Sequence, residues 1–290
     1  MALVEPKNTI EVLKKYGFSF RKRYGQNFLI DSHVLSKIIS AAELTKEDHV
    51  LEIGPGIGTL TEALSEAARD VTAVEIDETL IPILADTLSA CKNVTVVQGD
   101  VMKFDVDAFV REKCGGKRVK VVANLPYYIT TPIIMELLSK GAPIDSVTVM
   151  VQKEVADRMS ASPGTKEYGA LSLAVQYYAE PYLAANVPKN CFMPRPDVDS
   201  AVVRLTRRET PPCRVSDENL FFAVIRASFN ARRKTLVNGL RNAEFPEFTK
   251  EEIEESVAAA GCGPNVRGET LSIDEFAAVS NRLFEIRSAK

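Results

Sequence analysis

The sequence predicts an α/β fold in which a mostly parallel sheet is followed by a small all-helical domain, and three observations predict it. From residue 49 onward, short β-branched runs alternate with helical stretches, a pattern typical of parallel strands joined by right-handed crossovers. Two extended runs, 182–187 and 200–206, are joined by a short connection, which indicates a hairpin and hence an antiparallel last strand. Beyond the turn region 207–212 only helical patterns follow.

The individual elements follow from apolar periodicity and capping signals. Before the hairpin, strands are expected at residues 49–53, 71–76, 94–97, 119–123 and 146–151. Helices are expected around them at residues 59–68, 78–90, 106–112, 131–139 and 170–178. Two helices should precede the sheet, because the run from Asn8 to Glu11 reads as a capping box and a second helix should begin near Asp31.

We expect two domains. Residues 1–208 should hold the sheet together with an N-terminal helical extension, and residues 209–290 should form the helical domain. Within the second domain, helices are expected at residues 218–228, 233–241, 250–260 and 272–287.

Composition narrows the class of protein. The chain has 290 residues, of which 46% are hydrophobic, so it can bury one large core and a smaller second one. Its start lacks the apolar stretch of a signal peptide, and no apolar run reaches transmembrane length. The five cysteines form no C-x-x-C pair and there are only two histidines, which argues against a zinc site or a disulfide framework. We therefore expect a cytoplasmic, monomeric protein with no membrane partner and no metal.

The charge is unevenly distributed along the chain. The net charge is −3, but residues 204–241 carry nine Lys or Arg against three acids, whereas residues 244–290 carry five against ten. Residues 1–30 are also basic, with six Lys or Arg against two acids. Two basic segments on an otherwise acidic chain favour a localised surface for a polyanion, although any single one of these residues could simply be a solvated charge.

Polar residues and glycines fall at the carboxyl ends of four consecutive expected strands. A loop containing Gly54 and Gly56 follows the first strand, Glu75 ends the second, Asp100 follows the third and Asn124 follows the fourth. In an open α/β sheet these ends share one crevice, where ligands bind. A loose glycine loop or an acid after a strand is weak alone, but their joint register predicts a binding site.

The glycine spacing and Asp100 distinguish between cofactors. The loop reads G-x-G-x-G, which differs from the dinucleotide fingerprint G-x-G-x-x-G. Together with Asp100 this favours S-adenosylmethionine over NAD. Asp100 would accept a hydrogen bond from the adenine amine, Glu75 would bind the ribose hydroxyls, and the glycine loop would accommodate the methionyl part.

The run Asn124-Leu125-Pro126-Tyr127 suits a planar base with an exocyclic amine. The Asn124 amide oxygen and the Leu125 carbonyl, which the following proline keeps out of a helix, are two acceptors at one point. Tyr127 adds a ring that can stack on a base. If both acceptors bind the amine hydrogens, they stabilise the charge that develops on nitrogen during methyl transfer. The alternative is an ordinary strand-to-helix turn with a buried tyrosine.

With these motifs the chain resembles the small-subunit rRNA adenine N6,N6-dimethyltransferases nearly from end to end. Further resemblance lies in Tyr24-Gly25-Gln26-Asn27-Phe28-Leu29, in the loop 191–196, in the last strand 198–203 and in the basic run 229–234. The resemblance implies a Rossmann-like S-adenosylmethionine-dependent methyltransferase sheet with a C-terminal helical domain that binds RNA or the ribosome. It also implies the substrate, two adjacent adenosines in the 3′-terminal hairpin loop of 16S rRNA within a pre-ribosomal 30S particle.

The resemblance assigns roles to individual residues. Its cofactor-binding residues are Asn27, Leu29, Gly54, Gly56, Glu75, Ile76, Asp100, Val101 and Asn124. Its catalytic residues are Asn124, Leu125, Tyr127 and Phe192, the two rings enclosing the flipped base. Its RNA-binding residues are Arg232, Arg233 and Lys234, which would contact phosphates. From the residues alone, Phe192 could instead plug the core, and Asn27 and Leu29 could merely cap and pack the second helix.

Four other functions remain open at this point. A large-subunit rRNA adenine dimethyltransferase of the antibiotic-resistance type shares the chemistry, and a DNA adenine methyltransferase usually has a second proline where Leu125 stands. A nicotinamide-dependent dehydrogenase would use a similar sheet but should bind NAD. A non-catalytic assembly factor would use the fold only to bind RNA.

Overall fold

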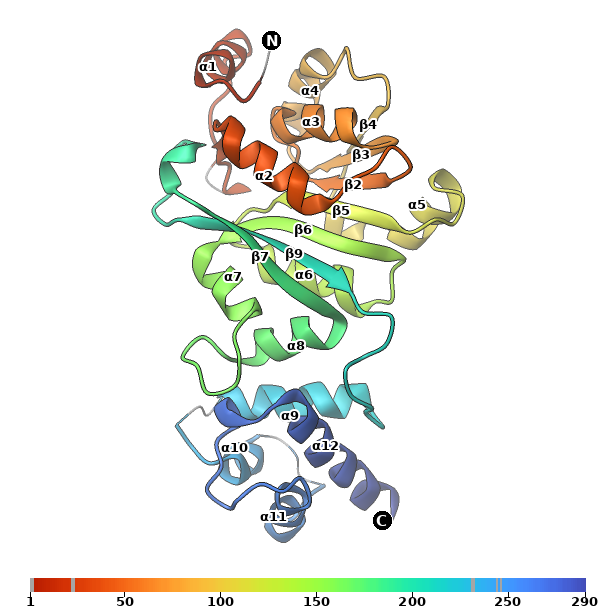
Figure 1. Ribbon diagram of the computed structural model, residues 1–290, viewed down its shortest axis with the longest axis vertical. Coiled ribbons are helices and arrows are strands. Elements are labelled where there is room, and N and C mark those ends of the chain that lie inside the picture. Colours follow the sequence, from red (N-terminus) through yellow and green to blue (C-terminus); the bar gives the residue numbers. More distant parts are fainter. Residues whose placement is uncertain (1–2, 22–23, 231–232, 244, 246) are drawn as a thin grey trace. The chain divides into compact units, whose positions relative to one another are not determined.

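The computed structural model describes residues 3–21, 24–230, 233–243, 245 and 247–290. The chain divides into two compact units, which are described separately (Figure 1). The first comprises Met1–Ala156 and Ala179–Arg207, and the second comprises Asp157–Tyr178 and Arg208–Lys290. The helical residues 157–178 therefore group with the C-terminal residues, whereas the sequence places them in the first domain.

The first unit is built on a seven-stranded sheet in the order β4-β3-β2-β5-β6-β9-β7. Its strands are β2 (His49–Ile53), β3 (Asp70–Glu75), β4 (Val94–Gln98), β5 (Val119–Asn124), β6 (Ile144–Gln152), β7 (Ala179–Val187) and β9 (Ser200–Arg207). The strands β2 to β6 pair in parallel, and β9 pairs antiparallel with both β6 and β7. The expected mostly parallel sheet with an antiparallel last strand is confirmed.

Helices cover both faces of this sheet. The helices of this unit are α1 (Pro6–Lys15), α2 (Ser32–Ala42), α3 (Thr59–Ala67), α4 (Ile81–Thr87), α5 (Val106–Lys113), α6 (Thr130–Ser139) and the start of α7 (Lys153–Met159). On one face α2 and α3 pack their apolar residues onto β2, β3, β5, β6 and β9, while α6 lies against β6 on the opposite face (Figure 1). Burial of these apolar side chains is the main force that holds the layers together.

Two N-terminal helix starts show how local signals compete. As expected, the Asp31 carboxylate caps α2 by accepting a hydrogen bond from the Val34 N–H at 3.0 Å. The prediction of a capping box at Asn8 is wrong, because α1 already begins at Pro6. Its N-cap residue is Glu5, whose side chain makes no capping hydrogen bond. Proline has no N–H to satisfy and a preset φ, so it is well suited to the first helical turn.

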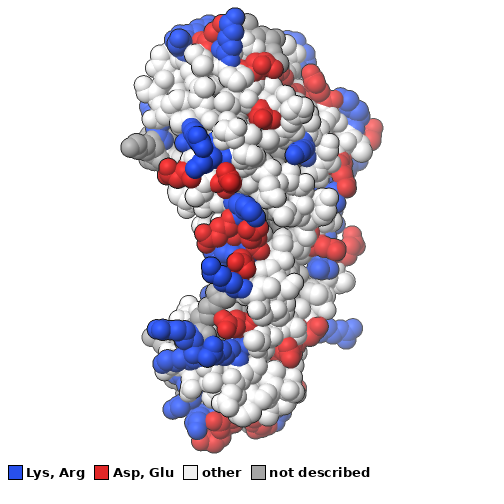
Figure 2. Space-filling view, turned by 60° about the vertical axis from the view of Figure 1, so that its left-hand side comes forward, with Lys and Arg blue, Asp and Glu red and all other residues white. Residues whose placement is uncertain are grey.

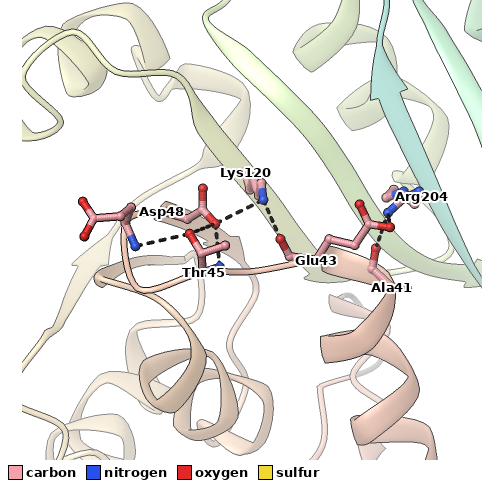
Figure 3. A network of polar contacts seen from close by, with 7 residues as sticks. Ala41, Glu43, Thr45, Asp48, Lys120 and Arg204 are labelled. Atoms are coloured by element: carbon pink, nitrogen blue, oxygen red, sulfur yellow. Dashed lines mark hydrogen bonds and ion pairs between the residues drawn. The ribbon is translucent and has the colours of Figure 1, made fainter.

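A polar network ties the end of α2 to the sheet at the opposite end of the strands from the glycine loop (Figure 3). Lys120 on β5 donates to the Glu43 carbonyl at 2.6 Å and to the Asp48 carboxylate at 3.1 Å. Arg204 on β9 donates to the Ala41 carbonyl at 3.3 Å and pairs with the Glu43 carboxylate. Because Lys120 and Arg204 are largely buried, these charges need such partners, and the network anchors α2 against β5 and β9.

A second, two-stranded sheet joins segments that lie far apart in the sequence. Strand β1 (Phe28–Leu29) pairs antiparallel with β8 (Phe192–Met193), so Leu29 lies opposite Phe192. The sequence does not predict this pairing, because strands of two residues carry no periodic signal. Its consequence is that the N-terminal motif and the late loop meet beside the main sheet.

The second unit is a bundle of helices around its own apolar core. It contains α8 (Ala170–Tyr178), α9 (Glu218–Asn230), α10 (Leu236–Asn242), α11 (Lys250–Ala259) and α12 (Ile273–Ser288). The Tyr177 ring of α8 packs against Phe221 of α9 with ring centroids 5.2 Å apart, which explains why 157–178 belong to this unit. Helix α10 begins three residues later than expected, because Thr235 caps it by accepting from the Asn238 N–H.

Candidate active site

One cavity in the first unit brings the expected ligand-binding residues together. All nine residues that the sequence assigns to cofactor binding line it, and so do Leu125 and Tyr127. The cause is the parallel register: β2, β3, β4 and β5 end side by side, so the residues that follow them converge. The N-terminal segment that carries Asn27 and Leu29 closes the cavity from another side.

The glycine loop is shaped by left-handed backbone and close approach. Gly54 and Gly56 have φ of +68° and +61°, a conformation that glycine adopts without the strain a side chain would cause. A Cβ at Gly56 would lie 3.0 Å from the Phe28 ring, whereas a Cβ at Gly54 would meet no atom within 4 Å. Gly56 therefore allows the Phe28 ring to pack against the loop, whereas Gly54 leaves open space beside the cavity.

Glu75 at the end of β3 is a buried carboxylate held by backbone donors. It accepts hydrogen bonds from the Asp77 N–H at 2.7 Å and the Gly56 N–H at 3.3 Å. Burial raises the pKa of this carboxyl to about 7, and the two N–H groups only partly offset that effect. These bonds fix Glu75 against the glycine loop, at the wall of the cavity.

Glu52 near the end of β2 is a site residue that the sequence does not reveal. Glu52 is 1% exposed and lines the same cavity. Neither of its carboxyl oxygens has a hydrogen-bond partner among the described residues. Burial raises the pKa of Glu52 to about 8. The Thr61 hydroxyl lowers this pKa and the Glu75 charge raises it, but burial is the largest cause. An orphaned buried carboxyl of this kind is costly unless a ligand completes it. In the sequence it is hidden inside an apolar strand.

The cavity wall near β4 combines a cap with an apolar surface. The Asp100 carboxylate accepts from the Met102 N–H at 3.0 Å and so caps a short 3₁₀ turn, Val101–Lys103. This is the capping role common for acids after strands, and it fixes the direction of the side chain. Ile76 is 47% exposed, which for a large apolar residue in a cavity offers a surface that a flat ring could cover.

The end of β5 presents an oriented amide. The Asn124 Nδ2 donates a hydrogen bond to the Asn27 carbonyl at 3.0 Å, and no described residue donates to Oδ1. Asn27 in turn uses its own side chain to reach the Gly25 carbonyl at 3.2 Å. The Asn124 amide oxygen is therefore held as an available acceptor at the cavity.

The next residue supplies the second acceptor. The Leu125 N–H donates to the Met150 carbonyl at 3.1 Å, which continues the sheet for one residue. The neighbouring Pro126 carbonyl accepts from the Ile129 N–H and the Thr130 hydroxyl. By contrast, none of the turn and loop hydrogen bonds of the described residues reaches the Leu125 carbonyl.

The two aromatic residues expected to enclose a base are placed differently. Tyr127 lines the cavity, and its hydroxyl lies 2.6 Å from the Ser200 Oγ, a buried anchor on β9 that fixes the ring. Phe192 is 3% exposed and packs with Leu29 and Cys191 in the apolar cluster under α2 instead of lining the cavity. This burial favours core packing, the alternative role for Phe192.

Two of the expected RNA-binding residues, Arg233 and Lys234, lie in the second unit between α9 and α10. Arg233 and Lys234 are exposed, and Arg232 lies outside the described residues. Figure 2 shows Lys and Arg side chains gathered on one side at the lower end of the view, where this unit lies. The unit therefore exposes a basic surface although residues 244–290 are acidic.

Comparison with known proteins decides the family. A family model described as ribosomal RNA adenine dimethylase matches residues 17–283. The chain belongs to this family. A protein of Lachnoclostridium phytofermentans named ribosomal RNA small subunit methyltransferase A is 61% identical over 284 residues, which are 98% of each chain. A protein of the same name from Listeria monocytogenes is 54% identical over 292 residues, 99% of each chain.

Two solved structures share the fold. The dimethyladenosine transferase from Plasmodium falciparum superposes with a TM-score of 0.72 at 26% identity, over 90% of this chain and 98% of that one. The 23S rRNA methyltransferase ErmE superposes with a TM-score of 0.67 at 27% identity, over 89% of this chain and 100% of that one. The predicted family, fold class and enzyme class, an rRNA adenine dimethyltransferase, are confirmed, and the dehydrogenase alternative is rejected.

Two further observations concern metals and membranes. Among the described residues, no three His, Cys, Asp or Glu side chains lie in a group that could hold a metal ion. No helix in that part of the chain is both long and apolar enough to span a bilayer.

Proposed function

We propose that this chain transfers methyl groups from S-adenosylmethionine to N6 of two adjacent adenosines in the 3′-terminal hairpin loop of 16S rRNA during small-subunit biogenesis. The observation that carries this proposal is the orientation of the Asn124 amide. Its nitrogen donates to the Asn27 carbonyl, which leaves its oxygen as an available acceptor in the cavity that Tyr127 and Leu125 also line. The names of the relatives at 61% and 54% identity support the choice of target.

The residues of the cavity fit S-adenosylmethionine. The orphaned Glu52 carboxyl, beside the glycine loop, matches a cationic α-amino group. In this proposal Glu75 accepts from ribose hydroxyls, Asp100 accepts from the adenine amine, and the exposed Ile76 packs on the adenine face. When bound, this cofactor supplies an electrophilic methyl group.

The chain's own residues then prepare the adenine nitrogen. Its lone pair is delocalised into the ring and is a poor nucleophile. When Asn124 Oδ1 and the Leu125 carbonyl accept its two hydrogens, they stabilise positive charge where it develops. Tyr127, anchored by Ser200, stacks on the flipped base and holds its plane. The alkylated nitrogen is acidic enough to lose its proton to water, and one N–H remains for a second transfer.

The principal alternative target is large-subunit rRNA, on which ErmE acts by its name. That structure is 27% identical to this chain, whereas the two small-subunit methyltransferases are more than 50% identical over nearly the whole length. The Asn-Leu-Pro-Tyr form of the motif, with Leu125 at its second position, also favours the small subunit.

We further propose that residues 1–208 form the methyltransferase domain and that residues 209–290 form the RNA- or ribosome-binding domain of a cytoplasmic monomer. Residues 157–178, which belong to the first of these stretches in sequence, group with the second in the fold. Arg233 and Lys234 are exposed in the second unit, and with Arg232 they would contact phosphates of a pre-ribosomal 30S particle. Such contacts position the enzyme but do not read sequence. Target choice would then come from the shape of the particle and from unpaired loop adenosines.

The test is methyl transfer from labelled S-adenosylmethionine to small subunits that lack the modification, with large subunits and adenine-rich DNA in parallel. Dimethyladenosine should appear only in small-subunit rRNA, at the two adjacent adenosines. Label on large subunits or DNA would refute the target but keep the chemistry. Cofactor binding without any transfer would instead support the assembly-factor alternative.

A further inference from the structure

Tyr24 and Tyr128 line the cavity of the active site but have no role in the account above. Tyr128 directly follows Tyr127, yet the two residues differ sharply. The Tyr127 hydroxyl is held inside by Ser200, whereas 59% of the Tyr128 surface is exposed. A large aromatic surface left open at the edge of a ligand cavity is a surface that a ligand can cover.

The Tyr128 ring is supported by the N-terminal segment. A Cβ at Gly25 would lie 3.4 Å from the ring carbon Cδ1 and 3.6 Å from Cε1, so the Gly25 backbone packs directly against the ring. Gly25 has φ of +57°, a conformation that favours glycine and brings the backbone close. The same segment contains Tyr24 and Asn27, so the ring position is coupled to the wall that orients Asn124.

Tyr128 lines the same cavity as Asp100 and Glu75. Desolvation raises the pKa of this phenol, and the Tyr24 phenol and the carboxylates of Asp100 and Glu75 raise it further. Asp100 and Glu75 are the residues assigned above to the adenine amine and the ribose.

We propose that Tyr128, together with Tyr24, forms an aromatic cover over the adenosine portion of bound S-adenosylmethionine. The proposal rests on the proposed function, since it takes Glu75 and Asp100 as the residues that bind this adenosine. Two consecutive tyrosines then divide the two substrates between them: Tyr127 contacts the target base and Tyr128 covers the cofactor. Exchange of spent cofactor between successive transfers requires this cover to open.

Calorimetric titration with S-adenosylhomocysteine, the unreactive product, tests the cover without any turnover. Tyr128→Ala should weaken binding by roughly 5- to 150-fold, the loss expected for one aromatic ring stacked on a base. Tyr128→Phe keeps the ring and should bind like wild type. The control is Tyr182→Ala on β7, which removes a ring of similar exposure, 56%, outside the cavity and should leave binding unchanged.

A double-mutant cycle tests the pair. If both rings cover the same ligand, Tyr24→Ala and Tyr128→Ala should show coupled losses, so that the double variant differs from the product of the single ones. Losses that simply multiply would overturn the pairing of Tyr24 with Tyr128.

Nitration by tetranitromethane tests the cover on the wild-type protein, so the result does not depend on whether a variant folds. Saturating S-adenosylhomocysteine should protect Tyr128, but not Tyr182, as read by peptide mass spectrometry. Equal nitration of Tyr128 with and without ligand, or wild-type affinity in Tyr128→Ala, would overturn the cover. A wild-type protein that binds no S-adenosylhomocysteine would instead refute the proposed function. Intact cofactor affinity with weakened RNA binding in Tyr128→Ala would assign the ring to RNA and also overturn it.

Discussion

The side-chain nitrogen of Asn124 donates a 3.0 Å hydrogen bond to the backbone carbonyl of Asn27, a residue 97 positions earlier in the chain. Because a carbonyl can only accept, this bond sets which end of the Asn124 amide faces the cavity. The N-terminal segment is itself fixed, since the Gln26 amide donates to the Asp77 carboxylate at 2.8 Å and Leu29 pairs with Phe192. The segment therefore orients an acceptor for the substrate as well as closing the cofactor cavity.

This relationship separates the backbone of Asn27 from its side chain. Asn27→Ala keeps the carbonyl that orients Asn124 and removes only the bond to the Gly25 carbonyl. We expect kcat to stay near wild type, KM for the cofactor to rise, and stability to fall by about 1 kcal/mol. Steady-state kinetics on small subunits checks this. A fall in kcat as large as that of Asn124→Ala would show that the side chain itself takes part.

The buried carboxyls Glu52 and Glu75 predict that the cofactor-free protein loses stability as the pH rises. Burial raises their pKa values to about 8 and about 7 from an ordinary 4.5, so the folded state holds protons that the unfolded state releases. This contribution is complete below about pH 4.5 and is lost as the pH rises toward 8.

Glu52→Gln should remove the Glu52 part of this dependence. The variant should gain in melting temperature relative to wild type as the pH is raised from 6 to 9, measured by circular dichroism without ligand. It should also bind S-adenosylhomocysteine more weakly, because the partner for the amino group is gone. Melting temperatures that change in parallel for the two proteins would contradict the assignment of Glu52 as a protonated buried carboxyl.

The burial of Phe192 predicts a large effect on stability. Phe192→Ala should lower the free energy of unfolding by about 3–5 kcal/mol, whereas Phe192→Leu should cost less because it keeps most of the volume. Denaturant unfolding measures both. The folded Leu variant then reports on stacking: unchanged methylation assigns Phe192 to packing alone, and lost methylation with an intact fold assigns it to the base.

The basic residues before α10 should act through charge. Removing Arg233 and Lys234 together should weaken binding to small subunits and reduce the slope of log K against log salt by roughly 1.5, as expected for two phosphate contacts. The matched control is the double change of Lys250 and Arg267 to Ala, since both are paired with acids of the same unit. Equal slopes for wild type and the Arg233/Lys234 variant would place the RNA contacts elsewhere.

The sequence predicts the sheet and most of the cavity because both follow from local, regular patterns of apolar and polar residues. Gly54, Glu75, Asp100 and Asn124 each follow an apolar β-branched run, and parallel strands bring such positions to one edge. Asp31 likewise caps its helix from a recognisable signal.

What the sequence cannot predict depends on contacts between distant segments. Glu52 reads as one residue of an apolar strand, and only the folded cavity shows that its carboxyl lacks a partner. The burial of Phe192 follows from pairing with Leu29, and the Ser200 anchor of Tyr127 joins residues 73 positions apart. The grouping of 157–178 with the helical unit depends on ring packing between Tyr177 and Phe221.

The most direct test of the central claim is the single-turnover rate of methyl transfer by Asn124→Ala at saturating cofactor and small subunits, with the exposed Asn186→Ala on β7 as control. The same preparations should be titrated with S-adenosylhomocysteine and with subunits. We predict a fall in rate of roughly 10²- to 10³-fold, as for the loss of one preorganised hydrogen bond to a developing charge, with subunit binding near wild type. A rate close to wild type, or equal loss of rate and subunit binding, would contradict the role of Asn124 as the acceptor that activates the adenine amine.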